Sequence, residues 1–217
     1  MSSRSGRRRR TVPDDVRSEI RARGGEKADR YVEQMARAAD AFRRDRDREV
    51  VGILRPLRDA LPDAPSVREL LGLAHYRIGN YAAAAKELEA YRNVTGAVDQ
   101  HPVLMDCYRA KRRHRLVDDL WAELAAASPS AALVAEGRIV EAGSLADRGR
   151  LDDALAMLRR RADDVKRPRD HHLRLWYALA DLEERAGNHA EARALFDRVR
   201  RRDPQFADVT ERRRALG

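Results

Sequence analysis

Apolar residues recur along most of the chain at intervals of three and four positions, which is the periodicity of amphipathic helices. Residues 71–88 show the arrangement most plainly. An apolar stretch that contains Gly72 ends at a turn with Gly79, and a second stretch follows in which Ala84 precedes Leu88 by four positions. Residues that favour strands are scarce, so the pattern predicts an all-α chain built from helical hairpins.

A small apolar residue followed four positions later by a large one recurs every 33 to 38 residues. The five pairs are Val50 with Leu54, Ala84 with Leu88, Val117 with Trp121, Ala154 with Leu158, and Ala192 with Phe196. Five positions before each pair stand Asp45, Gly79, Arg112, Gly149 and Gly187, and twelve positions after its small member stand Pro62, Gly96, Pro129, Lys166 and Pro204. Glycine can end a first helix in the left-handed conformation, and proline stops a second one. A single hairpin cannot bury its apolar stripe, so the repeat predicts a stack of hairpins.

The last unit carries the resemblance to a known family. Trp176, Leu179 and Ala180 share one helical face, Ala192 and Phe196 follow after a turn, and Pro204 closes the unit. This order resembles the tetratricopeptide repeat (TPR) pattern, W-x2-L-G-x2-Y, then A-x3-F, then P. The resemblance implies a right-handed α-solenoid of about five TPR-like hairpins with short capping helices at both ends. An ordinary helical bundle with accidental spacing is the alternative.

The turn glycines and terminating prolines also divide the chain into segments. We expect a disordered basic arm at 1–12, a helix at 13–25, solenoid units at about 26–62, 65–96, 98–129, 131–167 and 171–204, and a capping helix at 205–217. The first unit lacks the Trp and Leu-Gly positions and shows only Met35, Ala38, Ala39 and Phe42 as its apolar side. The fourth fits through Ile139, Ala142, Gly143 and Ala146 if the turn before Gly149 is one residue shorter than usual. Extra residues near 162–170 predict a lengthened loop, with Pro168 close to the next helix start.

The net charge of +9 is concentrated at the two ends of the chain. The arm holds five arginines and no acid, whereas the rest of the sequence up to residue 197 is balanced. Such ends can bind a polyanion through phosphate contacts, or can simply aid solubility. The candidate polyanion-binding residues are Arg4, Arg7, Arg8, Arg9, Arg10, Arg212, Arg213 and Arg214. They support a second hypothesis, a nucleic-acid- or ribosome-associated factor with RNA as a partner.

Catalytic and metal-binding patterns are absent from the sequence. No two of the six histidines are four positions apart, so we expect partly exposed or turn-proximal histidines and no zinc site. The single Cys107 cannot form an internal disulfide, which favours a reducing cytoplasm as the location, and it should pack as a small hydrophobe. The adjacent acids at 118–119 and 152–153 should lie in opening turns of helices. No phosphate-binding or nucleophile motif occurs, and no apolar run could span a membrane. We therefore expect no enzyme and no cofactor.

The family resemblance implies that the first helix of each hairpin lines a concave surface that binds a protein or peptide segment. The matching positions are Glu69, Leu73, Tyr76, Arg77, Asp106, Arg109, Arg174, Tyr177, Asp181 and Glu184. Tyrosine and arginine are enriched at binding hot spots, although these tyrosines could instead cover neighbouring hairpins. Leu73 and Glu69 stand where a receptor for chaperone tails would need Lys and Asn, which disfavours that class. The leading hypothesis is a non-enzymatic adaptor or scaffold; self-assembly through repeat faces is a further alternative.

Overall fold

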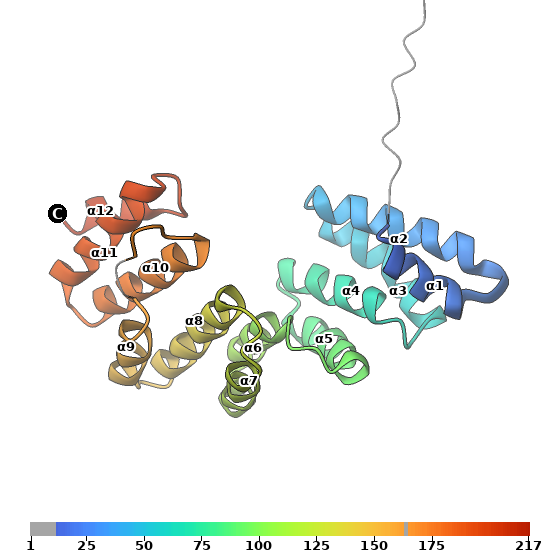
Figure 1. Ribbon diagram of the computed structural model, residues 1–217, viewed down its shortest axis with the longest axis horizontal. Coiled ribbons are helices and arrows are strands. Elements are labelled where there is room, and N and C mark those ends of the chain that lie inside the picture. Colours follow the sequence, from blue (N-terminus) through green and yellow to red (C-terminus); the bar gives the residue numbers. More distant parts are fainter. Residues whose placement is uncertain (1–11, 163–164) are drawn as a thin grey trace, which may run out of the picture. The chain divides into compact units, whose positions relative to one another are not determined.

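The computed structural model describes residues 12–162 and 165–217, and within these ranges the chain is helical with no strand (Figure 1). The chain divides into two compact units, Met1–Cys107 and Tyr108–Gly217. The arginines of the predicted arm lie outside the described residues. Val12 was assigned to that arm, but it is 4% exposed and belongs to the core of the first unit. The arm prediction is therefore wrong at its last residue, because Val12 packs with Ile20 and other apolar side chains of that core.

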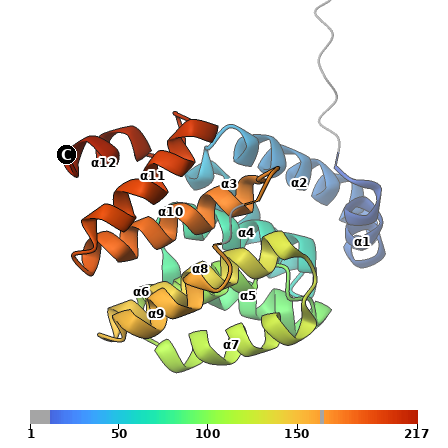
Figure 2. The same cartoon turned by 60° about the vertical axis from the view of Figure 1, so that its left-hand side comes forward.

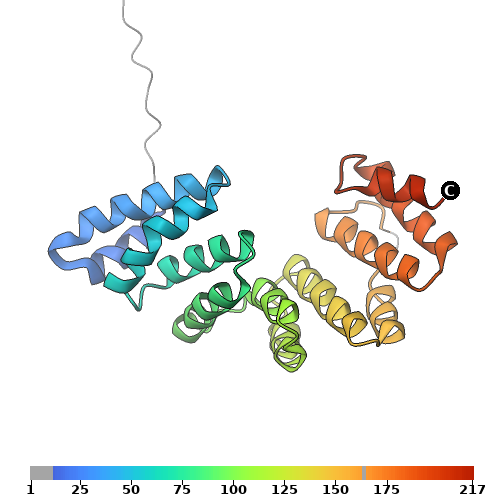
Figure 3. The ribbon, with the colours of Figure 1, turned by 180° about the vertical axis from the view of Figure 1, so that it is seen from behind.

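The first unit consists of helices that pack as antiparallel neighbours (Figure 3). They are α1 (Asp14–Gly24), a 3₁₀ turn (Gly25–Lys27), α2 (Ala28–Arg43), α3 (Asp47–Ala60), α4 (Pro65–Arg77) and α5 (Tyr81–Thr95), followed by α6 (His101–Ala110), which contains the boundary between the units. Helix α2 packs on α3, and α4 packs on both α3 and α5. Asn80 begins α5 by accepting a hydrogen bond from the Ala83 backbone N–H, and Gly96 ends it with a left-handed φ of 66°.

The second unit repeats the hairpin arrangement (Figure 2). Its helices are α7 (His114–Ala127), α8 (Ala131–Asp147), α9 (Leu151–Arg159), α10 (Asp170–Arg185), α11 (His189–Arg202) and α12 (Val209–Ala215). Helix α8 packs on α7, α9 and α10, while α12 packs on α11. Helix α10 begins two residues after Pro168. The last helix is shorter than the predicted 205–217, because the chain turns at Phe206 and Ala207 adopts a φ of +46°.

The repeat register read from the sequence agrees with the pattern of burial. Nine of the ten small and large anchor residues are at most 1% exposed, and Trp121 is the exception, because its side chain is only half-buried. Gly72 marks a tight crossing, since a Cβ atom there would lie 2.8 Å from Leu88 Cδ2. In the second unit Gly137 plays the same part, because a Cβ atom there would clash with Leu124 Cδ2. Only a residue without a side chain permits these helices to approach so closely.

The five turn positions share one backbone conformation, although only three of them are glycine. The φ angles of Gly79, Gly149 and Gly187 are 76°, 78° and 81°, and those of Asp45 and Arg112 are both 55°. All five lie in the left-handed region, which costs a residue with a side chain about 1–2 kcal/mol. The hairpin geometry therefore determines the turn, and the sequence accommodates it with strain at two sites.

Replacing Arg112 by glycine is expected to stabilise the protein by about 0.5–1 kcal/mol, because relief of this strain exceeds the added entropy of the unfolded chain. Urea denaturation followed by circular dichroism measures the change. Arg115→Gly is the matched control: Arg115 is exposed on α7, where the same loss of a side chain should destabilise because glycine is unfavourable within a helix. A less stable Arg112→Gly protein would contradict the strain argument.

Candidate interaction surfaces

The first-helix residues of the first unit are hydrogen-bonded to the neighbouring hairpin. Tyr76 Oη on α4 donates to Asp106 Oδ2 on α6 at 2.8 Å, so two predicted site residues are brought together. Burial and the adjacent Asp106 carboxylate raise the pKa of Tyr76 above its ordinary value. Glu69 accepts from Gln100 Nε2 at 2.8 Å, and burial and Asp99 raise its pKa. Leu73 is half-buried on the same helix.

Arg77 joins the end of α4 to the turn after α2. Its guanidinium stacks over the Phe42 ring at 3.6 Å from the centroid, and Nη1 donates to the Phe42 carbonyl at 3.1 Å and to Asp45 Oδ1 at 3.2 Å. The side chain remains 40% exposed. These contacts give Arg77 a structural role in the hairpin stack, while leaving one edge of the guanidinium accessible.

In the second unit the same kind of contact joins α6, α8 and α10. Arg109 Nε donates to Asp147 Oδ2 at 2.6 Å, and the guanidinium passes over Gly143, where a Cβ atom would clash with Nη1. Arg174 Nη1 donates to Glu136 Oε2 at 3.3 Å, with 54% of the arginine side chain exposed. Each bond connects the first helices of consecutive hairpins.

At the C-terminal end, α12 and Asp208, the residue just before it, supply the partners of α10. The Tyr177 hydroxyl donates to Asp208, and burial together with this bond raises the pKa of Tyr177 to about 12. Arg212 Nη2 donates to Asp181 Oδ1 at 2.9 Å and to Glu184 Oε2 at 2.6 Å.

This pairing bears on the predicted polyanion site at the C-terminus. Arg213 Nε donates to Asp197 Oδ2 at 2.9 Å, so two of the three arginines proposed there, Arg212 and Arg213, are paired with carboxylates within the unit. Arg214 is exposed on the same short helix. The remaining members of that set, Arg4 and Arg7 to Arg10, lie outside the described residues.

We define the first-helix row of the second unit as the side chains of α6, α8 and α10 that are bonded to the next first helix or to the C-terminal segment at α12. Its members are Arg109, Glu136, Asp147, Arg174, Tyr177, Asp181 and Glu184. Their partners lie 28 to 38 residues away in sequence, about one repeat, so each bond ties one hairpin to the next. The row holds charged side chains of both signs in fixed positions.

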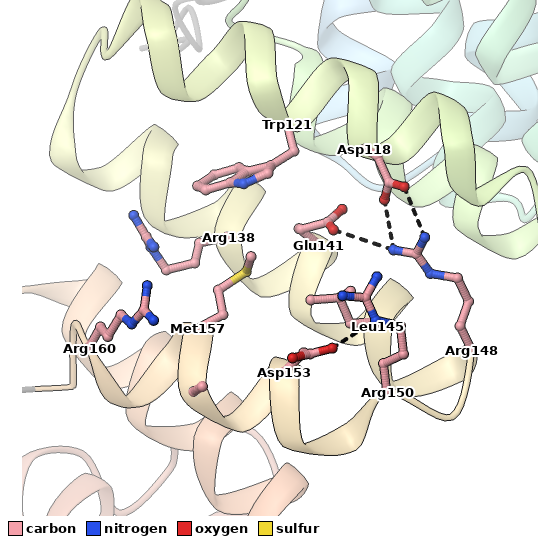
Figure 4. Close-up of a pocket in the computed structure, with 11 residues that line it drawn as sticks. Asp118, Trp121, Arg138, Glu141, Leu145, Arg148, Arg150, Asp153, Met157 and Arg160 are labelled. Carbon is pink, nitrogen blue, oxygen red and sulfur yellow. Dashed lines mark hydrogen bonds and ion pairs between the residues drawn. The ribbon is translucent and has the colours of Figure 1, made fainter.

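A second surface, absent from the predicted set, is a cleft of about 480 Å³ between α7, α8 and α9 (Figure 4). We call it the α7–α9 cleft. It is lined by Asp118, Trp121, Arg138, Glu141, Leu145, Arg148, Arg150, Asp153, Ala156, Met157 and Arg160. On α8 the lining residues Arg138, Glu141 and Leu145 follow helical spacing, and at 100° per residue they lie on the side opposite Glu136 and Asp147. The cleft therefore faces away from the first-helix row.

One end of the cleft contains a partly buried ion-pair network. Arg148 Nη2 and Nη1 donate to Asp118 Oδ1 and Oδ2 at 2.7 and 2.9 Å, and Nη2 donates to Glu141 Oε1 at 3.4 Å. Glu141 is 4% exposed and its Oε2 has no hydrogen-bond partner. Burial and the Asp118 carboxylate raise the pKa of Glu141 to about 7. Asp118 is thus an ion-pair residue beyond the first turn of α7, and its prediction as an opening-turn acid is wrong, whereas Asp152 and Asp153 do lie in the first turn of α9.

The other end of the cleft is aromatic and basic. The Arg138 guanidinium lies 5.0 Å from the centroid of the Trp121 ring, and Figure 4 shows Arg138 and Arg160 at the end away from Asp118 and Arg148. Met157 lies between the two ends. The signal available in the sequence was Trp121 itself, a large aromatic residue where the other repeats have Leu or Phe.

Cys107, His75 and His101 carry side chains that can react, and all three are buried. Burial raises the pKa of Cys107 to about 12, as fits a small packed side chain. His75 and His101 are 5% and 2% exposed, and both lie close to a turn: His101 begins α6, and the His75 carbonyl accepts from the Asn80 backbone N–H in the turn after α4. Among residues 12–162 and 165–217, no group of three potential metal ligands comes together. No helix in this part of the chain is long and apolar enough to cross a membrane.

Comparisons with known proteins agree with the hairpin repeat. Family models described as tetratricopeptide repeat match residues 27–98, which include the degenerate first unit, and residues 173–215. The fold is similar to that of a thermophilic TPR protein of Thermus thermophilus, with a TM-score of 0.63 and 16% identity over 86% of this chain and 98% of the other. It is also similar to a Podosopora anserina putative kinesin light chain with nearly identical TPR-like repeats, with a TM-score of 0.60 and 17% identity over 79% and 93% of the two chains. No curated protein sequence matches.

Proposed function

Because the chain belongs to the tetratricopeptide repeat family, we propose that it is a non-enzymatic adaptor that binds a protein segment along its first helices. Repeats of this family generally mediate protein–protein interaction, and such scaffolds are generally not catalytic. The proposal adds the location of the binding surface in the second unit, the first-helix row. It retains the predicted site residues Arg109, Arg174, Tyr177 and Asp181 as contacts.

The observation that supports this location is that the row is both fixed and accessible. Arg174 is 54% exposed and Asp181 is 39% exposed, although each is bonded to a neighbouring hairpin. Ordering a free, long side chain at an interface costs about 0.5–1.5 kcal/mol, and side chains already held in place avoid part of that cost. A partner segment would thus meet an ordered set of charges beside the ring of Tyr177.

Exposed ion pairs of this kind contribute little to folding, typically about 0–1 kcal/mol. Changing Arg174 should therefore leave the fold intact, while reversing a charge in the centre of the row. This separation makes Arg174 the most informative position for a binding test.

The Arg174→Glu variant is expected to capture the partner protein at least about tenfold less efficiently than the wild type, equivalent to about 1.4 kcal/mol. Full-length protein with a photo-crosslinking side chain at position 177 is used for capture from the native cell, with and without nuclease. Arg200→Glu is the matched control, because Arg200 is an exposed, ion-paired arginine on the second helix α11.

Undiminished capture by Arg174→Glu would remove the row from the binding site. Captured material that disappears with nuclease would instead favour the nucleic-acid hypothesis. Circular dichroism of each variant excludes unfolding as the cause of lost capture.

A further inference from the structure

Trp121 departs from the repeat pattern in a way that exposes an aromatic surface. The other large anchors, Leu54, Leu88, Leu158 and Phe196, are at most 1% exposed. On α7, Leu124 is 0% exposed and the Trp121 ring stays half-buried, although both lie against α8: a Cβ atom at Gly137 would clash with Leu124 Cδ2 and would be 3.4 Å from Trp121 Cε3. A half-buried Trp at the wall of a cleft is a common anchor for a partner's apolar side chain.

Beside Trp121, the positive and negative charges of the α7–α9 cleft do not balance. Arg148 is paired with Asp118 and Glu141, and Arg150 Nε donates to Asp153 Oδ2 at 2.8 Å. Within residues 12–162 and 165–217, Arg138 and Arg160 make no ion pair. Among the described residues, the cleft thus contains two guanidinium groups without a carboxylate partner, at the end where Trp121 and Met157 provide apolar surface (Figure 4).

The surroundings of Arg138 disfavour its charge. Burial and the positive charge of Arg161 both lower its pKa. A carboxylate placed between Arg138 and Arg160 would reverse this effect, because an ionised acceptor is the natural partner of a guanidinium and can bond to it through two parallel N–H groups.

We propose that the α7–α9 cleft is a second binding site, which takes an acidic segment of a partner protein. The segment presents a side-chain carboxylate to Arg138 and Arg160, and an adjacent apolar side chain packs on Trp121 and Met157. The volume of about 480 Å³ matches a few side chains and lies within the range of ordinary ligand pockets. The site rests on the proposed function in one respect, that the ligand is a protein.

The charges of the cleft select against other ligands. A basic segment would meet carboxylates that already have arginine partners, together with two unpaired arginines that repel it. A nucleic acid would have to carry successive phosphates past Glu141, Asp118 and Asp153, three acids in the same cleft. One or two carboxylates beside an apolar group satisfy the unpaired arginines without reaching the acidic end.

The test uses full-length protein and a library of blocked hexapeptides with randomised positions, from which retained peptides are sequenced. We expect enrichment of peptides that combine Asp or Glu with Leu, Ile or Phe. Selected peptides should bind at least about tenfold more tightly than the same peptides with amides in place of the carboxylates, and binding should perturb tryptophan emission. The signal should be lost in Trp121→Phe, because the only other tryptophan, Trp176, is 1% exposed.

The double variant Arg138→Glu/Arg160→Glu is expected to weaken binding of the selected peptides at least about tenfold. Arg115→Glu/Arg202→Glu carries the same change in charge on exposed arginines of α7 and α11, and should bind as the wild type does. No enrichment of acidic peptides, equal binding by the Arg138/Arg160 variant, or tighter binding of a single-stranded oligonucleotide would overturn the proposal.

The same variants separate this site from the first-helix row. If Arg174→Glu abolishes partner capture while the Arg138/Arg160 variant changes neither capture nor peptide binding, the adaptor function stands and the cleft site fails. If peptide binding depends on Arg138 and Arg160 while Arg174→Glu captures normally, the cleft stands and the row fails.

Discussion

Replacing Phe196 by alanine is expected to lower the free energy of unfolding by about 3–5 kcal/mol, the usual cost of deleting a buried aromatic ring. Phe196 is 0% exposed and connects three helices. Its ring meets Tyr177 of α10 at 5.5 Å in an edge-on arrangement, and Arg212 of α12 lies 5.1 Å above it. The cavity left by alanine would remove contacts from all three helices at once.

Urea denaturation followed by tryptophan emission measures this effect, because Trp176 lies in the same core cluster as Phe196. Val94→Ala serves as the control for loss of apolar surface, since Val94 is 48% exposed on α5 and its removal should change stability by no more than about 0.5 kcal/mol. Comparable effects of the two substitutions would mean that Phe196 is not a core residue of the last hairpin.

Replacing Glu87 by alanine is expected to destabilise the first unit by about 2–4 kcal/mol, since breaking a buried ion pair on one side costs more than the pair contributes to folding. Glu87 is 3% exposed, and its two oxygens accept from Arg58 Nη1 and, at 2.5 Å, from Arg68 Nη1. The arginine side chains are only 20% and 14% exposed. Removal of the carboxylate therefore leaves two poorly hydrated guanidinium groups, whose remaining partners are the exposed Asp59 carboxylate for Arg58 and the Pro62 carbonyl for Arg68.

The destabilisation could come from the arginine charges that lose the Glu87 carboxylate or from lost packing. A triple variant, Arg58→Met/Glu87→Leu/Arg68→Met, distinguishes these two sources. If the effect arises from the two arginines that lose the Glu87 carboxylate, the triple variant should recover most of the stability lost in Glu87→Ala, because none of these three charges remains. Chemical denaturation at constant pH compares the two proteins. Equal destabilisation by both variants would locate the effect in packing instead.

The turns and the hairpin cores were predictable because they depend on local sequence. Gly79, Gly149 and Gly187 mark turns through the backbone freedom that only glycine has, and pairs such as Ala84 with Leu88 record a helix crossing in the spacing itself. The family resemblance follows from these positions and is confirmed by the matching family models. Glycine does not mark every turn, however: Arg112, a residue with a side chain, adopts the same left-handed conformation where the hairpin packing requires it.

The interaction surfaces were less predictable because they depend on pairs separated by about one repeat. Periodicity places Tyr76 and Arg174 on first helices, but does not reveal that Asp106 and Glu136 are their partners. The binding role of the predicted site residues stays a prediction. The α7–α9 cleft was missed altogether, since side chains of three helices line it, and the repeat pattern does not reveal that the anchor residue Trp121 stays half-buried there.

The bonds of the first-helix row connect each hairpin only to its immediate neighbours, and this has a consequence for cooperativity. In such an array local opening spreads by nearest-neighbour coupling, so the terminal hairpin can fray while the preceding ones stay folded. A partner segment laid across Arg109, Arg174 and Asp181 would bridge several hairpins at once. Occupancy of the row would thereby convert a series of weakly coupled elements into a single unfolding unit, and the protein would be most rigid with a partner bound.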